Sequence, residues 1–280
     1  MNKPDLKNKV VVVSGGTGVL GSYWCKALAE CGAKVAILGT NLDKAQKLVK
    51  EIEEIGGVAL TVQTNVLDRQ SLIEAKKFIN ETFGTCDILI NGAGGNHPQG
   101  TTTKEYFELD DIKKDELLTF FNLPLEGFEH VFDLNLIGTL LATQVFAQDM
   151  LGKKDATIIN ISSMNAFKPL TKIPAYSAAK AAISNFTQWL AVHFAKVGIR
   201  VNAIAPGFFL TSQNENLLID KEGNLTDRAH KIINHTPMGR FGKPEELVGT
   251  LLYLVDAEAS GFVTGIVIPV DGGFSAYSGV

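Results

Sequence analysis

A tyrosine and a lysine four positions apart form the pair of side chains best suited to moving a proton. Tyr176 and Lys180 lie near the start of a long segment with helical periodicity, and residues four apart share one face of a helix. A phenol, whose ordinary pKa is about 10, exchanges protons poorly at neutral pH unless a nearby cation stabilises its phenolate. The pair therefore predicts a general acid or base.

Two further polar residues are placed to assist this pair. Ser163 follows the apolar run Ile158–Ile161, where a hydroxyl at the end of a strand can hydrogen-bond a substrate oxygen; a serine that only terminates the strand is the alternative. Asn135 interrupts an apolar helical segment, and such a residue satisfies backbone groups at a bend, holds a water, or does both. We expect Ser163 to lie beside the helix that carries Tyr176.

A glycine-rich turn follows the first apolar run of the chain. Val10–Val13 leads directly into Gly15, Gly18 and Gly21, and a helical pattern begins within this turn. Glycine is needed where the backbone lies against a pyrophosphate, and the N–H groups and dipole of the helix start stabilise its negative charge. The position of the turn predicts a dinucleotide site, with a purely structural turn as the alternative.

The second predicted strand carries the signal for the choice of dinucleotide. An acidic residue at its end would bind the adenosine ribose, whereas an arginine nearby would accept a 2′-phosphate. Here the strand ends in Gly39, Thr40 and Asn41, which supply neither. The choice between NAD and NADP stays open.

Short β-branched runs alternate with longer segments of helical period, as in parallel βαβ units. We expect strands near residues 9–14, 34–39, 58–64, 86–91, 156–162, 199–205 and 263–269. We expect helices near residues 19–31, 41–55, 69–83, 126–150, 175–197 and 243–256. This pattern predicts one α/β domain over 1–280, a doubly wound, mostly seven-stranded parallel sheet with helices on both faces (a Rossmann fold). Insertions near 95–125 and 207–240 follow strands four and six, where they are placed to cover a ligand.

Composition excludes several classes of protein. Hydrophobic residues make up 45% and charged residues 20% of 280 residues, which argues against a disordered chain, a fibre or a coiled coil. A net charge of −4 provides no basic field for nucleic acid or an anionic membrane. The three cysteines, at 25, 31 and 86, have no metal-ligand spacing, and we expect buried thiols and no metal site. The apolar runs are shorter than the ~20 residues that span a bilayer and no signal segment is evident, so we expect a cytoplasmic protein.

Taken together, these motifs resemble the compact branch of the short-chain dehydrogenases/reductases, from Lys9 to about Phe274. The resemblance rests on the glycine-rich turn, the residues singled out above and several further segments. The further segments are Asn91-Gly92-Ala93-Gly94, Asn202-Ala203-Ile204-Ala205-Pro206-Gly207, Thr264-Gly265 and Asp271-Gly272-Gly273.

The resemblance implies specific roles in hydride transfer between a nicotinamide and a secondary alcohol or ketone. Tyr176 would be the general acid/base, Lys180 would lower its pKa and bind the nicotinamide ribose, Ser163 would orient the reacting oxygen, and Asn135 would hold a water. NAD or NADP would be bound by Gly15, Thr17, Gly18, Val19, Leu20, Gly21, Thr40, Asn41, Asn65, Val66, Asn91, Gly92, Ala93, Gly94, Tyr176, Lys180, Pro206, Gly207, Phe209 and Thr211.

Two departures from the family pattern stand out. The glycines are spaced as in the longer, sugar-nucleotide-modifying branch, although the chain length and the ending Pro-Val-Asp-Gly-Gly-Phe are typical of the compact branch. Asn65 stands where the family usually has an acid after strand three, which loosens the assignment of the adenine side.

The segment Gly94–Gln99 looks like that of a subgroup of D-mannonate oxidoreductases (fructuronate reductases), which implies a sugar-acid substrate. A polyhydroxy carboxylate needs several donors and a cation near the reaction centre. The candidates to bind it are Asn96, His97, Ser163, Asn165, Lys168 and Arg240. The other histidines, at 130, 193, 230 and 235, lie on predicted helices and are interpreted as structural or solvated.

Two alternatives belong to other functional classes. A nucleotide-sugar epimerase or dehydratase that retains its NAD would share the glycine spacing, and a non-catalytic dinucleotide sensor would share the turn. The resemblance also implies a homo-oligomer, a tetramer or a dimer, with contacts along the helices 126–150 and 175–197.

Overall fold

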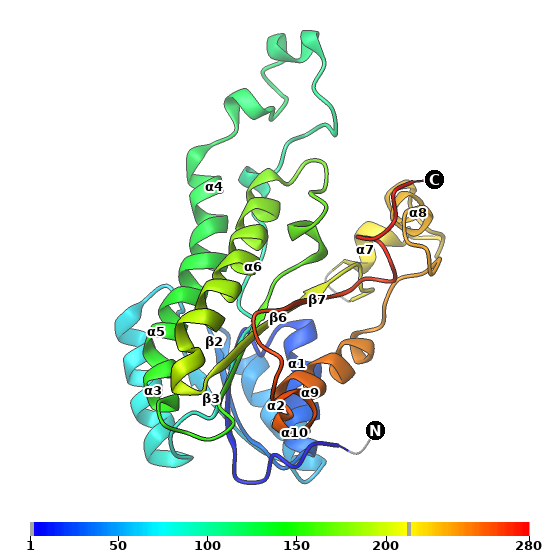
Figure 1. Cartoon of the computed structure of the whole chain (residues 1–280). Coiled ribbons are helices and arrows are strands. Elements are labelled where there is room, and N and C mark those ends of the chain that lie inside the picture. Colours follow the sequence, from blue (N-terminus) through cyan, green and yellow to red (C-terminus); the bar gives the residue numbers. More distant parts are fainter. Residues whose placement is uncertain (1–2, 212–213, 280) are drawn as a thin grey trace.

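A seven-stranded sheet, all of whose neighbouring strands run parallel, forms the centre of the computed structural model, which describes residues 3–211 and 214–279 (Figure 1). Its spatial order is β3-β2-β1-β4-β5-β6-β7. The strands are β1 Val10–Ser14, β2 Lys34–Gly39, β3 Val58–Gln63, β4 Ile88–Asn91, β5 Thr157–Ile161, β6 Arg200–Pro206 and β7 Val267–Val270. The predicted doubly wound fold is confirmed.

The strands form where β-branched residues run without interruption, because both faces of the sheet are covered. Within β1 the side chains alternate between two cores, with Val11 and Val13 in one and Val10 and Val12 in the other. The register pairs Val12 of β1 with Leu89 of β4, so the carboxyl ends of these two central strands lie side by side.

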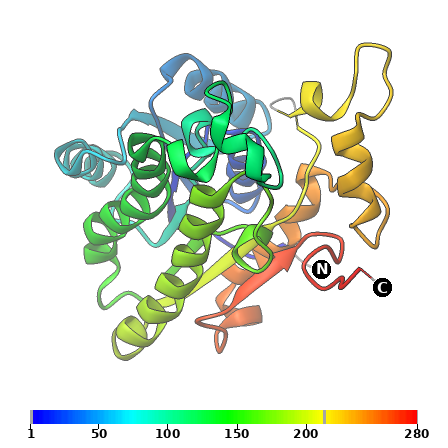
Figure 2. The same ribbon diagram turned by 90° about the horizontal axis from the view of Figure 1, so that it is seen from above.

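Helices cover both faces of the sheet, as Figure 2 shows from above. Residues of α1, α2 and α9 pack into one core, and residues of α3, α5 and α6 pack into the other. The helices are α1 Val19–Glu30, α2 Leu42–Glu54, α3 Arg69–Thr82, α4 Leu125–Phe132, α5 Gly138–Met150, α6 Pro174–Phe194, α7 Glu215–Leu218, α8 Asp227–Asn234, α9 Val248–Val255 and α10 Ala257–Ser260.

Three predicted elements differ in detail. The helix expected over 126–150 is α4 and α5 joined by a π-helical turn, Asp133–Ile137. The last strand begins at Val267 rather than at 263, because Gly265 turns the chain with φ +78°. The helix expected from 243 starts with a 3-10 turn, Pro244–Leu247, before α9.

One helical stretch, Leu125–Met150, is long and apolar enough to cross a membrane, with a mean hydropathy of 1.2 in its most apolar window. Half of that window is buried within the protein, and residues such as Phe146 pack against the sheet. Packing over the sheet thus explains its apolar character.

The two insertions lie above the carboxyl ends of the strands in Figure 1. The first follows β4 and contains 3-10 turns at Pro98–Gly100, Leu109–Lys113 and Phe120–Asn122. The second follows β6 and carries the short helices α7 and α8. That the two insertions cover a ligand stays a prediction.

Candidate active site

The glycine-rich turn folds tightly over the ends of β1 and β4. Gly15 has a left-handed φ of +67°, and a Cβ there would lie 2.7 Å from the backbone of Gly92 and Ala93. A Cβ on Gly21 would lie 2.4 Å from the carbonyl of Gly15. Neither position accepts a side chain, and the turn therefore forms a bare backbone surface.

Helix α1 begins at this surface without a side-chain cap. Its N-cap is Gly18, and the helix start carries no carboxylate in its first turn. The N–H groups and positive dipole end of α1 are thus left for an external anion, which is what a pyrophosphate requires. The turn fits the predicted dinucleotide, with Thr17, Val19 and Leu20 on the same segment.

The expected adenosine side is built from the ends of β2 and β3. The Asn41 side chain caps α2 by accepting a hydrogen bond from the Lys44 amide at 2.9 Å. The Asn65 carboxamide likewise accepts from the Leu67 amide at 3.0 Å, and Val66 is buried against Gly138. These side-chain oxygens shape their own loops, so cofactor contacts by Thr40, Asn41 and Asn65 stay a prediction.

The side chain of Asn91 lies in a buried polar chain. Its amide donates to Thr143 at 3.0 Å and to Asn160 at 2.8 Å, and Asn160 donates to Thr187 at 2.9 Å. This chain joins β4, β5, α5 and α6 beneath the site. Asn91 therefore acts here as a support for the loop that follows it, Gly92-Ala93-Gly94.

Gly94 marks the point at which two predicted catalytic residues meet. A Cβ at this position would lie 2.5 Å from the Asn135 carboxamide oxygen and 3.1 Å from the Lys180 ammonium nitrogen. These residues come from the π-helical turn and from α6, more than 40 positions apart in the sequence. The fold thus brings Asn135 and Lys180 to the same loop, as the sequence predicts.

Asn135 is held by three hydrogen bonds. Its amide donates to the carbonyls of Gly95 and Val131, both at 2.7 Å, and its oxygen accepts from the Gly95 amide at 3.2 Å. The bond to Gly95 ties the helix to the loop after β4 at the place where the helix widens into a π turn. The predicted role of satisfying backbone groups at a bend is confirmed.

Lys180 is buried, with 4% of its surface exposed, and its ammonium donates to the Ile161 carbonyl at 2.8 Å. Burial disfavours the charged form and lowers the pKa of Lys180 to about 7. The ammonium nitrogen lies 5.5 Å from the centre of the Tyr176 ring. The tyrosine and lysine of the predicted pair are therefore neighbours on one face of α6.

Burial raises the pKa of the Tyr176 phenol, and a hydrogen bond with Ser163 opposes that rise. The expected lowering of the pKa below its ordinary value is thus wrong for the protein without cofactor. The reason is the burial of the phenol itself, which disfavours the charged phenolate. Ser163, at the start of a 3-10 turn after β5, is the group that favours the phenolate here.

The expected nicotinamide side is the segment after β6. The Gly207 amide donates to the Val270 carbonyl at 2.9 Å, and a Cβ on Gly207 would lie 2.5 Å from Asp271. Phe209 is buried in the core, and the Thr211 amide is held by Asn214 at 2.8 Å. Pro206 and Gly207 thus lie at the carboxyl edge, whereas the Phe209 side chain faces the core.

The predicted substrate residues fall into two groups. Asn165, beside Ser163, is buried, and its side-chain oxygen has no hydrogen-bond partner within the described residues, so its contact with a substrate stays a prediction. Arg240 is exposed and forms two 2.7 Å hydrogen bonds to Glu246, which commits its guanidinium to the protein itself. Asn96 and His97 hydrogen-bond within their own turn, to Thr101 and to the Gln99 amide.

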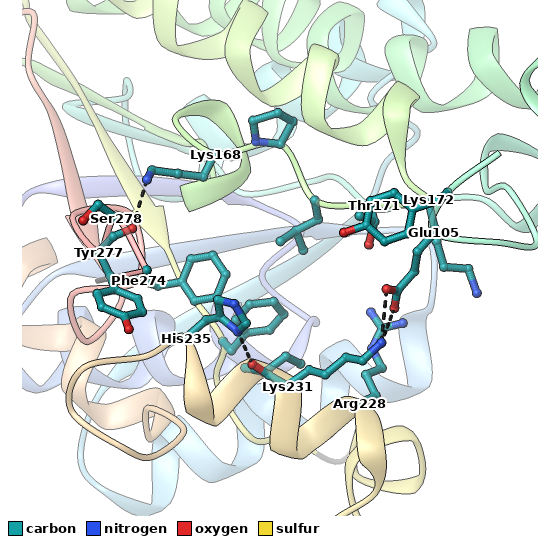
Figure 3. A pocket seen from close by; sticks show the side chains of 16 residues that line it. Glu105, Lys168, Thr171, Lys172, Arg228, Lys231, His235, Phe274, Tyr277 and Ser278 are labelled. Carbon is teal, nitrogen blue, oxygen red and sulfur yellow. Dashed lines mark hydrogen bonds and ion pairs between the residues drawn. The ribbon is translucent and has the colours of Figure 1, made fainter. Parts of the chain in front are cut away.

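Lys168 is the predicted substrate residue that lines the cavity shown in Figure 3. This cavity of about 440 Å³ lies between the segment 168–172, α8 and the C-terminal segment 274–279. Its other cations are Lys172, Arg228 and Lys231, none of which was predicted as a site residue. Arg228 and Lys231 lie in the insertion near 207–240, which contains no recognisable motif.

The cysteines are buried, as the sequence analysis expects, and one exposed histidine, His235, lines the cavity. All three cysteines are buried and free. Within the described residues no group of three potential metal ligands occurs. His235, expected to be structural or solvated, lines the cavity and hydrogen-bonds the Lys231 carbonyl at 2.7 Å.

Comparisons with known proteins agree with this site. Residues 9–222 match the sequence model of the short chain dehydrogenases. An oxidoreductase of Haemophilus influenzae whose function is not characterised is 59% identical over 99% of this chain and 96% of its own length. A 2-dehydro-3-deoxy-D-gluconate 5-dehydrogenase of Formosa agariphila is 33% identical over 98% of this chain and 96% of its own length.

A solved structure is similar throughout. It is a Haemophilus influenzae protein, provisionally assigned as a D-mannonate oxidoreductase and solved with bound NAD, at 59% identity. The superposition has a TM-score of 0.95 and covers 99% of this chain and 98% of the other. By its sequence, its sheet and its Ser163, Tyr176 and Lys180 constellation, the chain belongs to the short-chain dehydrogenase family and is an oxidoreductase that acts on CH–OH groups with NAD or NADP.

Proposed function

We propose that this protein interconverts a sugar acid and its keto form with NAD, and that D-mannonate and D-fructuronate are the substrate pair. The observation that carries the proposal is the meeting of Asn135 and Lys180 at Gly94, with the Tyr176 ring beside the Lys180 ammonium. A cavity rich in cations is lined by the segment 168–172, which precedes Tyr176 in the chain. The provisional assignment and the bound NAD of the Haemophilus influenzae structure support the choice of substrate and cofactor.

The residues that would hold NAD are those of the bare glycine turn and of the loop after β4. NAD, when bound, supplies or accepts the hydride. Gly15 and Gly21 leave room for a pyrophosphate, and the start of α1 supplies donors and a positive dipole end for it. The end of β2 carries neither an acid for the adenosine ribose nor an arginine for a 2′-phosphate, so the choice of NAD rests on the NAD bound in the Haemophilus influenzae structure.

The chain's own contribution to the reaction is proton transfer at the Tyr176 hydroxyl. In the direction of reduction the phenol donates its proton to the oxygen of the substrate, and in oxidation the phenolate takes it back. Ser163 hydrogen-bonds the phenol, and its hydroxyl would orient the reacting oxygen of the substrate. Lys180, anchored to the Ile161 carbonyl, supplies positive charge beside the developing phenolate.

The experiment that tests this function is an absorbance assay at the nicotinamide band with purified protein. D-mannonate would be offered with NAD and with NADP, D-fructuronate with the reduced cofactors, and a panel of neutral polyols and ketones in parallel. We expect turnover with the sugar acid and NAD. An epimerase would show no net absorbance change and a sensor no turnover, and either result would contradict the proposal.

We also infer that the chain forms a single domain in a cytoplasmic homo-oligomer that binds neither nucleic acid nor membranes. Three buried free thiols agree with a reducing compartment. Trp189 and Val192 on α6 and Phe262 before β7 are exposed apolar side chains suited to contacts between subunits. Sedimentation equilibrium would distinguish a tetramer or dimer from the monomer that would contradict this inference.

A further inference from the structure

The side chains that line the cavity in Figure 3 have a net positive charge, whereas the protein as a whole has a net negative charge. Four of the lining side chains are cationic and one is acidic, although the whole protein has a net charge of −4. The cations are Lys168, Lys172, Arg228 and Lys231, and the acid is Glu105. A site with this excess of positive charge favours an anionic ligand.

One of these cations already holds a carboxylate. The Lys231 ammonium on α8 lies 3.0 and 3.1 Å from the two oxygens of Glu105, which comes from the other insertion. The ion pair lies in the lining of the cavity and connects the two insertions (Figure 3). It shows that α8 presents an ammonium to a carboxylate at this position.

Two cations of the cavity, Arg228 and Lys172, have unpaired charged groups. Among the described side chains neither forms an ion pair or a side-chain hydrogen bond, whereas Lys168 donates to the Tyr277 carbonyl at 3.0 Å. Lys172 belongs to the segment 168–172, whereas Arg228 lies on α8. Arg228 and Lys231 are three positions apart and so share one face of α8. A planar guanidinium beside an ammonium is well suited to a carboxylate, which accepts two parallel hydrogen bonds from arginine.

The cavity is also connected to the reactive residues. Its wall opposite α8 is the segment 168–172, which joins Ser163 to Tyr176 along the chain. Phe208 and Phe274 line it as well, and Phe208 directly follows the Pro206–Gly207 edge of the site.

We propose that Arg228 and Lys231 of α8 bind the carboxylate of the substrate, so that this cavity is the recognition site for the acid end of the sugar. The inference rests on the proposed function, because it names how a sugar acid is distinguished from a neutral polyol. Glu105 is the internal carboxylate that holds Lys231 in place when no substrate is bound.

The test uses the full-length enzyme and four variants. Arg228→Gln and Lys231→Gln remove the two charges, Arg228→Lys keeps the charge without the planar fork, and Lys221→Gln removes an exposed cation from the same insertion outside the cavity. The measurements are KM and kcat for D-fructuronate with NADH, and the dissociation constant of D-mannonate by calorimetry without cofactor.

We expect Arg228→Gln and Lys231→Gln each to raise KM and the dissociation constant about tenfold, with kcat within about twofold, because one charge-assisted contact is lost. Arg228→Lys recovers part of the loss, and Lys221→Gln behaves as the unaltered enzyme. If Arg228→Gln and Lys231→Gln match Lys221→Gln in both measurements, the proposal is overturned. An unaltered enzyme that binds no sugar acid overturns it too, whereas one that binds D-mannonate through Arg228 but does not turn it over contradicts only the proposed reaction.

Discussion

The burial of Lys180 makes the stability of the protein depend on pH in a way that one substitution removes. An unfolded lysine keeps its proton up to its ordinary pKa of 10.5, whereas the folded protein loses this proton near pH 7. Between these values the unfolded chain binds more protons, so the free energy of unfolding rises with pH. Below pH 7 both states are protonated and the full cost of burying the charge is present, on the order of 5 kcal/mol.

Replacement of Lys180 by methionine removes this titration. The hydrogen bond to the Ile161 carbonyl is lost as well, but that loss shifts stability by an amount that does not change with pH in this range. The buried thiols titrate equally in both proteins and cancel in the comparison. We therefore expect the difference in unfolding free energy, unaltered protein minus Lys180→Met, to increase by about 2 kcal/mol from pH 7 to pH 9.

Urea unfolding followed by circular dichroism at several pH values measures this difference. The substrate and cofactor are left out, so that the result reports only on the folded and unfolded chain. If the unfolding free energies of the unaltered protein and of Lys180→Met differ by the same amount at pH 7 and at pH 9, the reasoning is refuted. A constant difference would show that Lys180 keeps an ordinary pKa in the folded protein.

Two further predictions concern the loop after β4 and the phenol. Gly94→Ala would place a methyl group 2.5 Å from the Asn135 oxygen, and we expect a loss of about 1–3 kcal/mol in urea unfolding together with reduced turnover. Gly249→Ala on α9, where a Cβ meets nothing within 4 Å, is the control and should be neutral or stabilising; equal losses in both variants would contradict the steric argument. Ser163→Ala removes the hydrogen bond that lowers the pKa of Tyr176, so the pKa in the pH profile of oxidation should move to higher pH, and an unmoved profile would show that Ser163 does not act on the phenol.

The core of the fold could be predicted because its pattern is periodic. Each β-branched run and each helical segment of the βαβ units appears in the structure, and the reactive residues follow strands whose carboxyl ends meet at one edge. The meeting of Asn135 and Lys180 at Gly94 follows from that topology.

The interior of the insertions could not be predicted in the same way. Their short turns are held by individual contacts such as the 2.9 Å Lys104–Asp111 ion pair and the Glu105–Lys231 pair, which leave no period in the sequence. Arg228 was missed for this reason. The pKa shifts of Tyr176 and Lys180 could not be predicted either, because they arise from burial in the packed protein. The spacing in the sequence shows only that the two side chains share a helix face.

The central claim is that the Tyr176 hydroxyl transfers the proton in an oxidoreductase reaction. The measurement that tests it most directly compares Tyr176→Phe with the unaltered enzyme in turnover of the sugar acid and in NADH binding by fluorescence, with Tyr253→Phe on α9 as the control. We predict unchanged NADH binding and a kcat reduced by about 10²–10⁴-fold in Tyr176→Phe alone, the range expected for the loss of a general acid/base. A Tyr176→Phe enzyme whose kcat stays within a few-fold of the control would contradict the account.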